Sequence, residues 1–95
     1  MMRMITAREA KAITITVGGR LEGEYVEALD TSVKQVIAQG RPVSLFLRDV
    51  SSIDDSAREL LGRLAAKGVH LSAAGVYNSY IVAQISASAA SGPSP

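Results

Sequence analysis

Residues 43–64 read VSLFLRDVSSIDDSARELLGRL, and the change of pattern inside this stretch is the strongest structural signal in the chain. Residues 43–48 place apolar side chains at every second position, which is typical of a strand with one buried face. From Ala57 onward the apolar residues instead follow a helical spacing, at Ala57, Leu60, Leu61, Leu64 and Ala65. The stretch therefore predicts a strand, an acidic and hydroxyl-rich turn over residues 49–56, and an amphipathic helix.

The segments on either side predict five more elements. They are an edge strand over residues 2–6, a strand over 12–17 that ends at Gly18 and Gly19, a helix over 21–39, a strand over 69–74 and a helix over about 78–85. Gly40 and Pro42 mark the end of the first helix, because glycine adopts the left-handed conformation that closes a helix and proline cannot continue it.

The strands over 43–48 and 69–74 both alternate between apolar and mostly polar residues. Parallel strands that are covered on both faces usually read as unbroken apolar runs, so this alternation favours helices on one face only. Right-handed crossovers that progress in one direction also place their helices on the same side. We therefore expect an α/β fold with a small mixed sheet, helices packed on one face and the other face open. One domain should span residues 1–85, and the small, uncharged segment 86–95 should be a disordered tail.

The composition restricts the kinds of partner. The chain has 10 Lys and Arg against 9 Asp and Glu, and no basic cluster exceeds two residues, which argues against a nucleic-acid or anionic-membrane surface. No apolar run approaches the roughly 20 residues of a membrane span, and Arg3, Arg8 and Glu9 interrupt any signal-peptide core. There is no cysteine, so thiolate metal sites and disulfides are excluded. We expect a soluble cytoplasmic protein without direct membrane insertion.

The residue types needed for catalysis are sparse. A nucleophilic Ser51, Ser52 or Ser56 would need a histidine base, and His70 is the only histidine. The strand pattern places His70 on the open face as an ordinary surface residue. We therefore expect no enzymatic activity and no cofactor.

Asp54 and Asp55 could be a carboxylate pair for acid–base chemistry or for magnesium, but neighbouring acidic residues before a helix are more often caps. Asp54, Asp55 or Ser56 is expected to accept a hydrogen bond from a backbone N–H, and if Ser56 is the cap, Glu59 would complete a capping box. This pattern favours no metal site. The turn and the helix start would instead present fixed charges and N–H donors to a partner protein.

The order strand, strand, helix, strand, Asp-containing turn, helix, strand, helix resembles the STAS domain, the family of anti-sigma factor antagonists. The resemblance covers about residues 13–85. Its motifs here are GRLE at 19–22, LFLRDVSSID at 45–54, LL at 60–61 and KGV at 67–69.

The resemblance implies how the turn is used. In switching members, an Asp is followed by a phosphorylatable Ser or Thr, a small residue, Gly and an apolar residue. Here Asp54 matches the Asp, Asp55 stands at the phosphorylated position, Ser56 matches the small residue, Ala57 replaces Gly and Arg58 replaces the apolar residue. We therefore expect no phospho-switch at the family position and one locked charge state, with Ser56 or Ser52 as possible substitute phosphorylation sites.

The resemblance also implies a partner. The binding surface would comprise Asp54, Asp55, Ser56, Ala57 and Arg58 with the neighbouring Glu22 and Gly23. The partner would be an anti-sigma-type kinase or another signalling protein. As an alternative, the chain resembles the compact STAS subunits of bacterial ABC-type phospholipid transporters, which dock on the ATPase, because no strand and helix follow residue 85.

Overall fold

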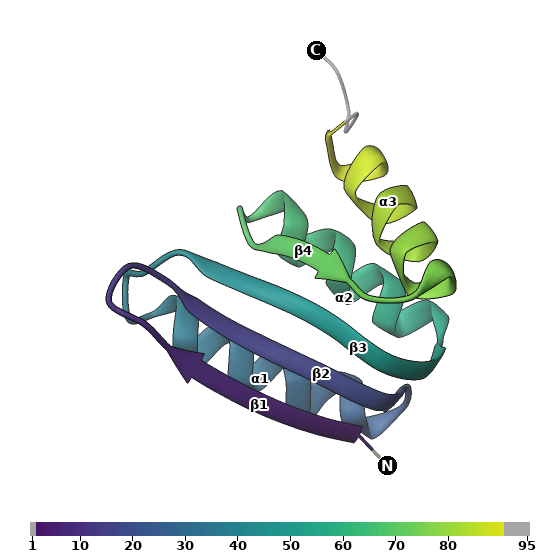
Figure 1. Ribbon diagram of the computed structural model, residues 1–95, viewed down its shortest axis with the longest axis horizontal. Helices are drawn as coiled ribbons and strands as arrows, with labels where there is room; N and C mark the ends of the chain where they lie inside the picture. Colours follow the sequence, from purple (N-terminus) through teal and green to yellow (C-terminus); the bar gives the residue numbers. More distant parts are fainter. Residues whose placement is uncertain (1, 91–95) are drawn as a thin grey trace.

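The chain folds into a mixed four-stranded sheet with three helices, as Figure 1 shows for the computed structural model, which describes residues 2–90. The elements are β1 (Met2–Arg8), β2 (Ile13–Leu21), α1 (Glu24–Ile37), β3 (Val43–Ile53), α2 (Asp55–Ala66), β4 (His70–Ala73) and α3 (Val76–Ala90). The strand order is β1-β2-β3-β4, with β1 antiparallel to β2 and the other pairs parallel. The predicted α/β class is confirmed.

The core lies on one face of the sheet. Ile15 of β2 and its neighbour Leu45 of β3 are fully buried, whereas Thr14 and Thr16 point to the other face and stay half-buried. In Figure 1 α1 and α2 lie behind the sheet, and α3 packs on α2 beside β4. Each fully buried aliphatic side chain contributes about 1.5–3 kcal/mol to folding. The face toward the viewer is open, as the alternation predicts.

Strands β2 and β3 are longer than predicted. β2 continues through Gly18 and Gly19 to Leu21, and β3 continues beyond Asp49 to Ile53. The pairing survives because β3 carries extra residues, so that the partners run Val17↔Leu47, Gly19↔Val50 and Arg20↔Ser52. The sequence-based prediction, which ended the first of these strands at the glycines and began the turn at residue 49, was wrong. A glycine inside a strand pattern here marks a bulge and not a strand end.

Helix α1 begins at Glu24 and not at residue 21, because Leu21 is still paired with Ile53 in the sheet. Gly23 has φ 56° and ψ −130°, and the Tyr25 N–H donates to the Glu22 carbonyl at 3.1 Å. This is the geometry of a type II′ turn, which requires glycine at its first central position. At the other end of the helix Gly40 has φ 78°, so the predicted left-handed residue is confirmed.

Helix α3 continues to Ala90, five residues beyond the predicted end. The prediction of a disordered tail over 86–95, and with it the domain boundary at 85, was therefore wrong for residues 86–90. That segment reads SASAA, and its alanines are the strongest helix formers, which offsets the weaker serines. The remaining part of the predicted tail, 91–95, lies outside the described residues. Within residues 2–90, no helix is long and apolar enough to cross a membrane.

Gly62, in the interior of α2, is a position where the fold can be stabilised. A Cβ added there would meet no atom within 4 Å, and the position is only partly buried. Glycine in a helix costs roughly 0.5–1 kcal/mol relative to alanine. Gly62→Ala should therefore raise the free energy of unfolding by about that amount, measured by urea unfolding.

Gly40→Ala is the matched control. Its Cβ would also have open space, but the positive φ penalises an L residue. This variant should lose roughly 1–2 kcal/mol. Equal effects of the two substitutions would contradict the backbone assignment at both positions.

Candidate protein-interaction surface

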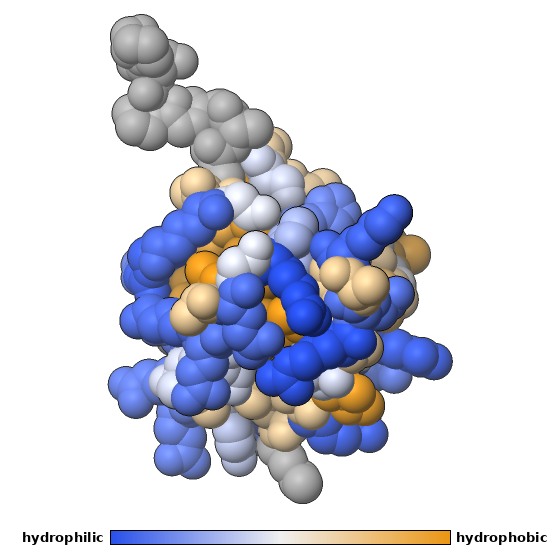
Figure 2. Space-filling model, turned by 90° about the vertical axis from the view of Figure 1, so that its left-hand side faces the viewer, coloured by the Kyte–Doolittle hydropathy of each residue, from blue (hydrophilic) through white to orange (hydrophobic). Residues whose placement is uncertain are grey.

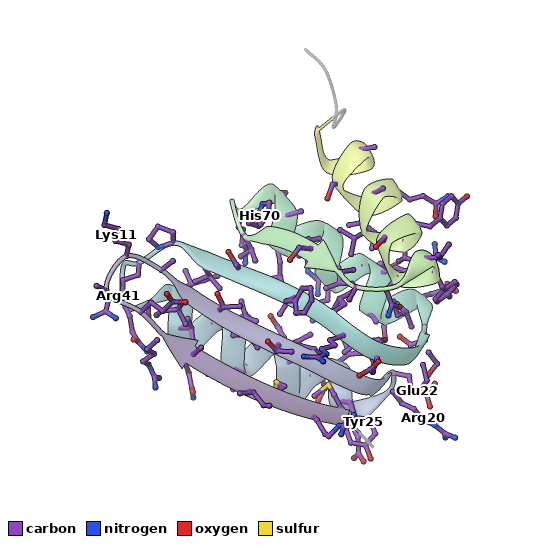
Figure 3. The ribbon with its side chains drawn as sticks, viewed as in Figure 1. Lys11, Arg20, Glu22, Tyr25, Arg41 and His70 are labelled. Atoms are coloured by element: carbon purple, nitrogen blue, oxygen red, sulfur yellow. The ribbon has the colours of Figure 1, made fainter. Side chains whose placement is uncertain are left out.

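The predicted surface lies at the carboxyl ends of the parallel strands β2 and β3, where α1 and α2 begin. Leu21 and Ile53 are paired at this end of the sheet. Figure 3 labels Arg20, Glu22 and Tyr25 here, while Lys11 and Arg41 lie at the opposite end of the molecule. Residues separated by about 30 positions in the sequence therefore meet in one place.

The Asp54 carboxylate joins the two helix starts. Its Oδ1 accepts hydrogen bonds from the Ala57 N–H and the Ser56 hydroxyl, both at 2.8 Å. Its Oδ2 accepts the N–H of Gly23, the N-cap residue of α1, at 2.9 Å. The prediction that an acidic or serine residue caps α2 is confirmed, and Asp54 is that residue. The alternative of a Ser56 cap with a capping box to Glu59 was wrong.

These three donors also act on the ionisation of Asp54. They lower its pKa from the ordinary value of 3.8, with the Gly23 N–H as the largest cause and the Ala57 N–H and Ser56 hydroxyl after it. Each donor favours the charged carboxylate. Because the folded-state pKa is below the unfolded one, the stabilisation is complete above the unfolded pKa. It is lost as the pH falls through the folded-state pKa.

A second contact fixes Glu22 against the end of β3. The Ser52 hydroxyl donates to Glu22 Oε2 at 3.0 Å. Arg20 Nη1 lies 4.0 Å from Glu22 Oε1 between two well exposed side chains, so this ion pair adds little. Glu22 and Gly23 thus lie beside Asp54, where the sequence placed them.

The predicted binding residues differ in their accessibility. Asp55, Ser56 and Arg58 are exposed at the start of α2. Ala57 is fully buried, so its side chain packs in the core and does not face a partner. The exposed part of this surface is therefore formed by charged and hydroxyl side chains around a fixed backbone.

The structure does not bring His70 to the serines. His70 begins β4 and pairs with Ser44, whereas Ser51 and Ser52 lie at the far end of β3. Seven residues of extended strand separate these positions by roughly 20 Å. Figure 3 likewise shows His70 far from Glu22. Among the described residues, no three side chains of the metal-ligating types gather into a possible metal site.

The sequence-based reasoning missed a feature on the open face of the sheet. Arg3, Gly18 and Arg48 lie there around a shallow hollow. The available signal was Gly18, because a glycine within a strand often marks a close approach of another backbone.

Comparisons with known proteins assign no family to this chain. The chain matches no protein-family model, and no curated protein matches its sequence. The resemblance to the STAS domain stays a prediction from the order of the elements and the motifs at 19–22 and 45–54.

Asp54→Asn tests the carboxylate that joins the helices. Asparagine is a good N-cap, so the bond from Ala57 should be kept, but the amide NH₂ cannot accept the Gly23 N–H. The variant should be less stable than the wild type at about pH 7, and this difference should shrink as the pH falls below 3.8 and through the lowered folded-state pKa of Asp54. Thermal unfolding at several pH values measures both effects.

Asp55→Asn is the control, because Asp55 is exposed and lies one residue further along the same helix start. It should change the stability less than Asp54→Asn. A wild type and an Asp54→Asn variant with the same dependence of stability on pH would contradict the assigned role.

Proposed function

We propose that this protein is a non-enzymatic, STAS-like interaction module of the bacterial cytoplasm, which binds a partner protein through the starts of α1 and α2. The first candidate partner is an anti-sigma-type kinase or another signalling protein. The observation that carries the proposal is the Asp54 carboxylate, which accepts donors from both helix starts. The exposed Asp55 and Arg58 therefore stand on a backbone that is fixed before binding.

Such a fixed backbone favours recognition of a protein. A surface that is ordered before binding avoids part of the entropy cost of association. Asp55 and Arg58 carry opposite charges, so a partner must match both signs at a defined spacing. Charge complementarity of this kind contributes mainly to specificity and to the association rate.

The hydrogen bonds also support a surface that is not switched by phosphorylation. The Ser56 hydroxyl donates to Asp54, and the Ser52 hydroxyl donates to Glu22. A phosphate on either serine would remove that donor and place about −1.5 to −2 charges beside a carboxylate. Both substitute sites are therefore unfavourable, and Asp55 would supply one permanent negative charge at the position where the resemblance implies a phosphorylated residue.

Two charge reversals at the surface test the proposal. Asp55→Lys and Arg58→Glu should each weaken capture of the partner by about tenfold or more when tagged protein is purified from the source cell and bound proteins are quantified. Co-purification of an anti-sigma-type kinase would support the first candidate partner, and an ABC ATPase would support the transporter alternative.

The controls are Glu9→Lys and Arg63→Glu, which make the same reversals elsewhere on exposed residues. Glu9 lies in the β1–β2 turn, at the end viewed in Figure 2, where hydrophilic side chains cover most of the surface. These variants should retain the partner. Retention by Asp55→Lys and Arg58→Glu as well, with unchanged melting temperatures, would refute the proposed surface.

A further inference from the structure

The open face of the sheet holds a hollow of about 250 Å³. It is lined by Arg3 and Ile5 of β1, Thr16 and Gly18 of β2, and Arg48 and Asp49 of β3. In Figure 1 this face is turned toward the viewer, with α1 and α2 behind it. These lining residues do not overlap with residues 22, 23 and 54–58, so the hollow is separate from the surface around Asp54.

The sheet register places two arginines on either side of one glycine. Arg3 is paired with Gly18 across β1 and β2. On the other side of Gly18 lies β3, where the register runs from the pair Val17↔Leu47 to the pair Gly19↔Val50. Two β3 residues, Arg48 and Asp49, therefore lie opposite Gly18. Neighbouring strands lie about 4.8 Å apart, so two long side chains two strands apart can converge over the middle strand.

Gly18 forms the floor of the hollow because a side chain would not fit. A Cβ at this position would lie 2.8 Å from the Arg48 carbonyl oxygen, closer than carbon and oxygen atoms normally approach. The same Cβ position is 3.6 Å from Nη2 and 3.9 Å from Nε of Arg3, so the guanidinium already lies over the glycine.

The bulge in β3 orients the other side of the hollow. Asp49 has φ 58°, and no other non-glycine among residues 2–90 has a positive φ. Residues in such sparsely populated backbone conformations are concentrated at functional sites. Bulges of this kind redirect side chains at the edges of sites.

The two guanidinium groups have one weak counter-charge between them. Within the described residues Arg3 has no ion pair, and Arg48 Nε lies 4.0 Å from Asp49 Oδ2 with both side chains largely exposed. Separations of this size between exposed groups contribute little. The hollow therefore has two guanidinium groups available to an anion and only one carboxylate at its edge.

We propose that this hollow binds the phosphate group of a phosphomonoester, with Arg3 and Arg48 on opposite sides of it and the Thr16 hydroxyl as an additional donor. A guanidinium donates two parallel hydrogen bonds to an oxyanion. Two guanidinium groups that each donate two hydrogen bonds need more acceptor oxygens than the two of a carboxylate. A phosphate group provides these additional oxygens. Ile5, whose side chain is 68% exposed, offers apolar contact to the organic part of the ester.

This site differs from a phosphate loop, in which backbone N–H groups hold the anion. Here the binding groups are side chains from three adjacent strands. The phosphate could belong to a soluble ester or to a lipid headgroup, since the chemistry recognised is the same.

Titration followed by amide NMR tests the site. Inorganic phosphate, added at constant ionic strength against sodium chloride, should give saturable shifts at Gly18 and Asp49. Arg3→Gln and Arg48→Gln should each weaken binding by about tenfold. Arg8→Gln is the matched control, because Arg8 lies on β1 but pairs with Ile13, on the opposite face of the strand, and it should leave the affinity unchanged.

Asp49→Asn makes a prediction in the other direction. Asparagine tolerates the left-handed conformation as aspartate does, so the bulge should be kept. Loss of the carboxylate beside Arg48 should tighten phosphate binding by about two- to fivefold. Unchanged or weaker binding by a folded Asp49→Asn variant would contradict the proposal.

Vesicles of phosphatidylcholine with and without phosphatidic acid distinguish a lipid headgroup from a soluble ester as the source of the phosphate. Saturation by inorganic phosphate without binding to either kind of vesicle supports a soluble ligand, and arginine-dependent binding only to vesicles with phosphatidic acid supports a lipid headgroup. No saturable shift with phosphate and no such vesicle binding would overturn the proposal. So would equal losses in the Arg3→Gln and Arg8→Gln variants.

Discussion

The sheet buries only one of its faces, because its strands place apolar side chains at alternate positions and the helices gather on that side. Ile13, Ile15 and Val17 of β2 and Leu45 and Leu47 of β3 all join one core with residues of the three helices. Packing of these side chains sets which way each neighbouring residue points. Thr16, Gly18 and Arg48 therefore face outward, on the sheet surface that holds the hollow.

The pairing of β2 with β3 connects this core to the surface around Asp54. Two irregularities in β3 let the parallel pairing continue to Leu21 and Ile53, so that β2 and β3 end at the same edge of the sheet. The Asp54 N–H then donates to the Leu21 carbonyl at 3.3 Å, and the carboxylate reaches the Gly23 N–H. The bulge at Asp49 thus contributes to both surfaces, since it shapes the hollow and also carries β3 to the helix starts.

The two surfaces rely on different physics. At the helix starts, backbone N–H groups stabilise the charged carboxylate of Asp54, and the exposed charges around it are of both signs. On the open face, the Arg3 guanidinium lies over Gly18, and one exposed carboxylate, that of Asp49, lies beside Arg48. The first arrangement suits a protein surface with complementary charges, whereas the second suits a small oxyanion.

The sequence by itself determined the α/β class, the one-sided core, the left-handed Gly40 and a helix cap within residues 54–56, because these follow from local periodicity and local hydrogen bonding. It also placed Glu22 and Gly23 beside Asp54 through the resemblance. Only the tertiary structure decided the course of residues 18–21 and 49–53, since a bulge depends on which strand lies alongside and not on local pattern. For the same reason the sequence could not show that Arg3 and Arg48, 45 positions apart, lie on either side of Gly18: strand pairing alone brings them together.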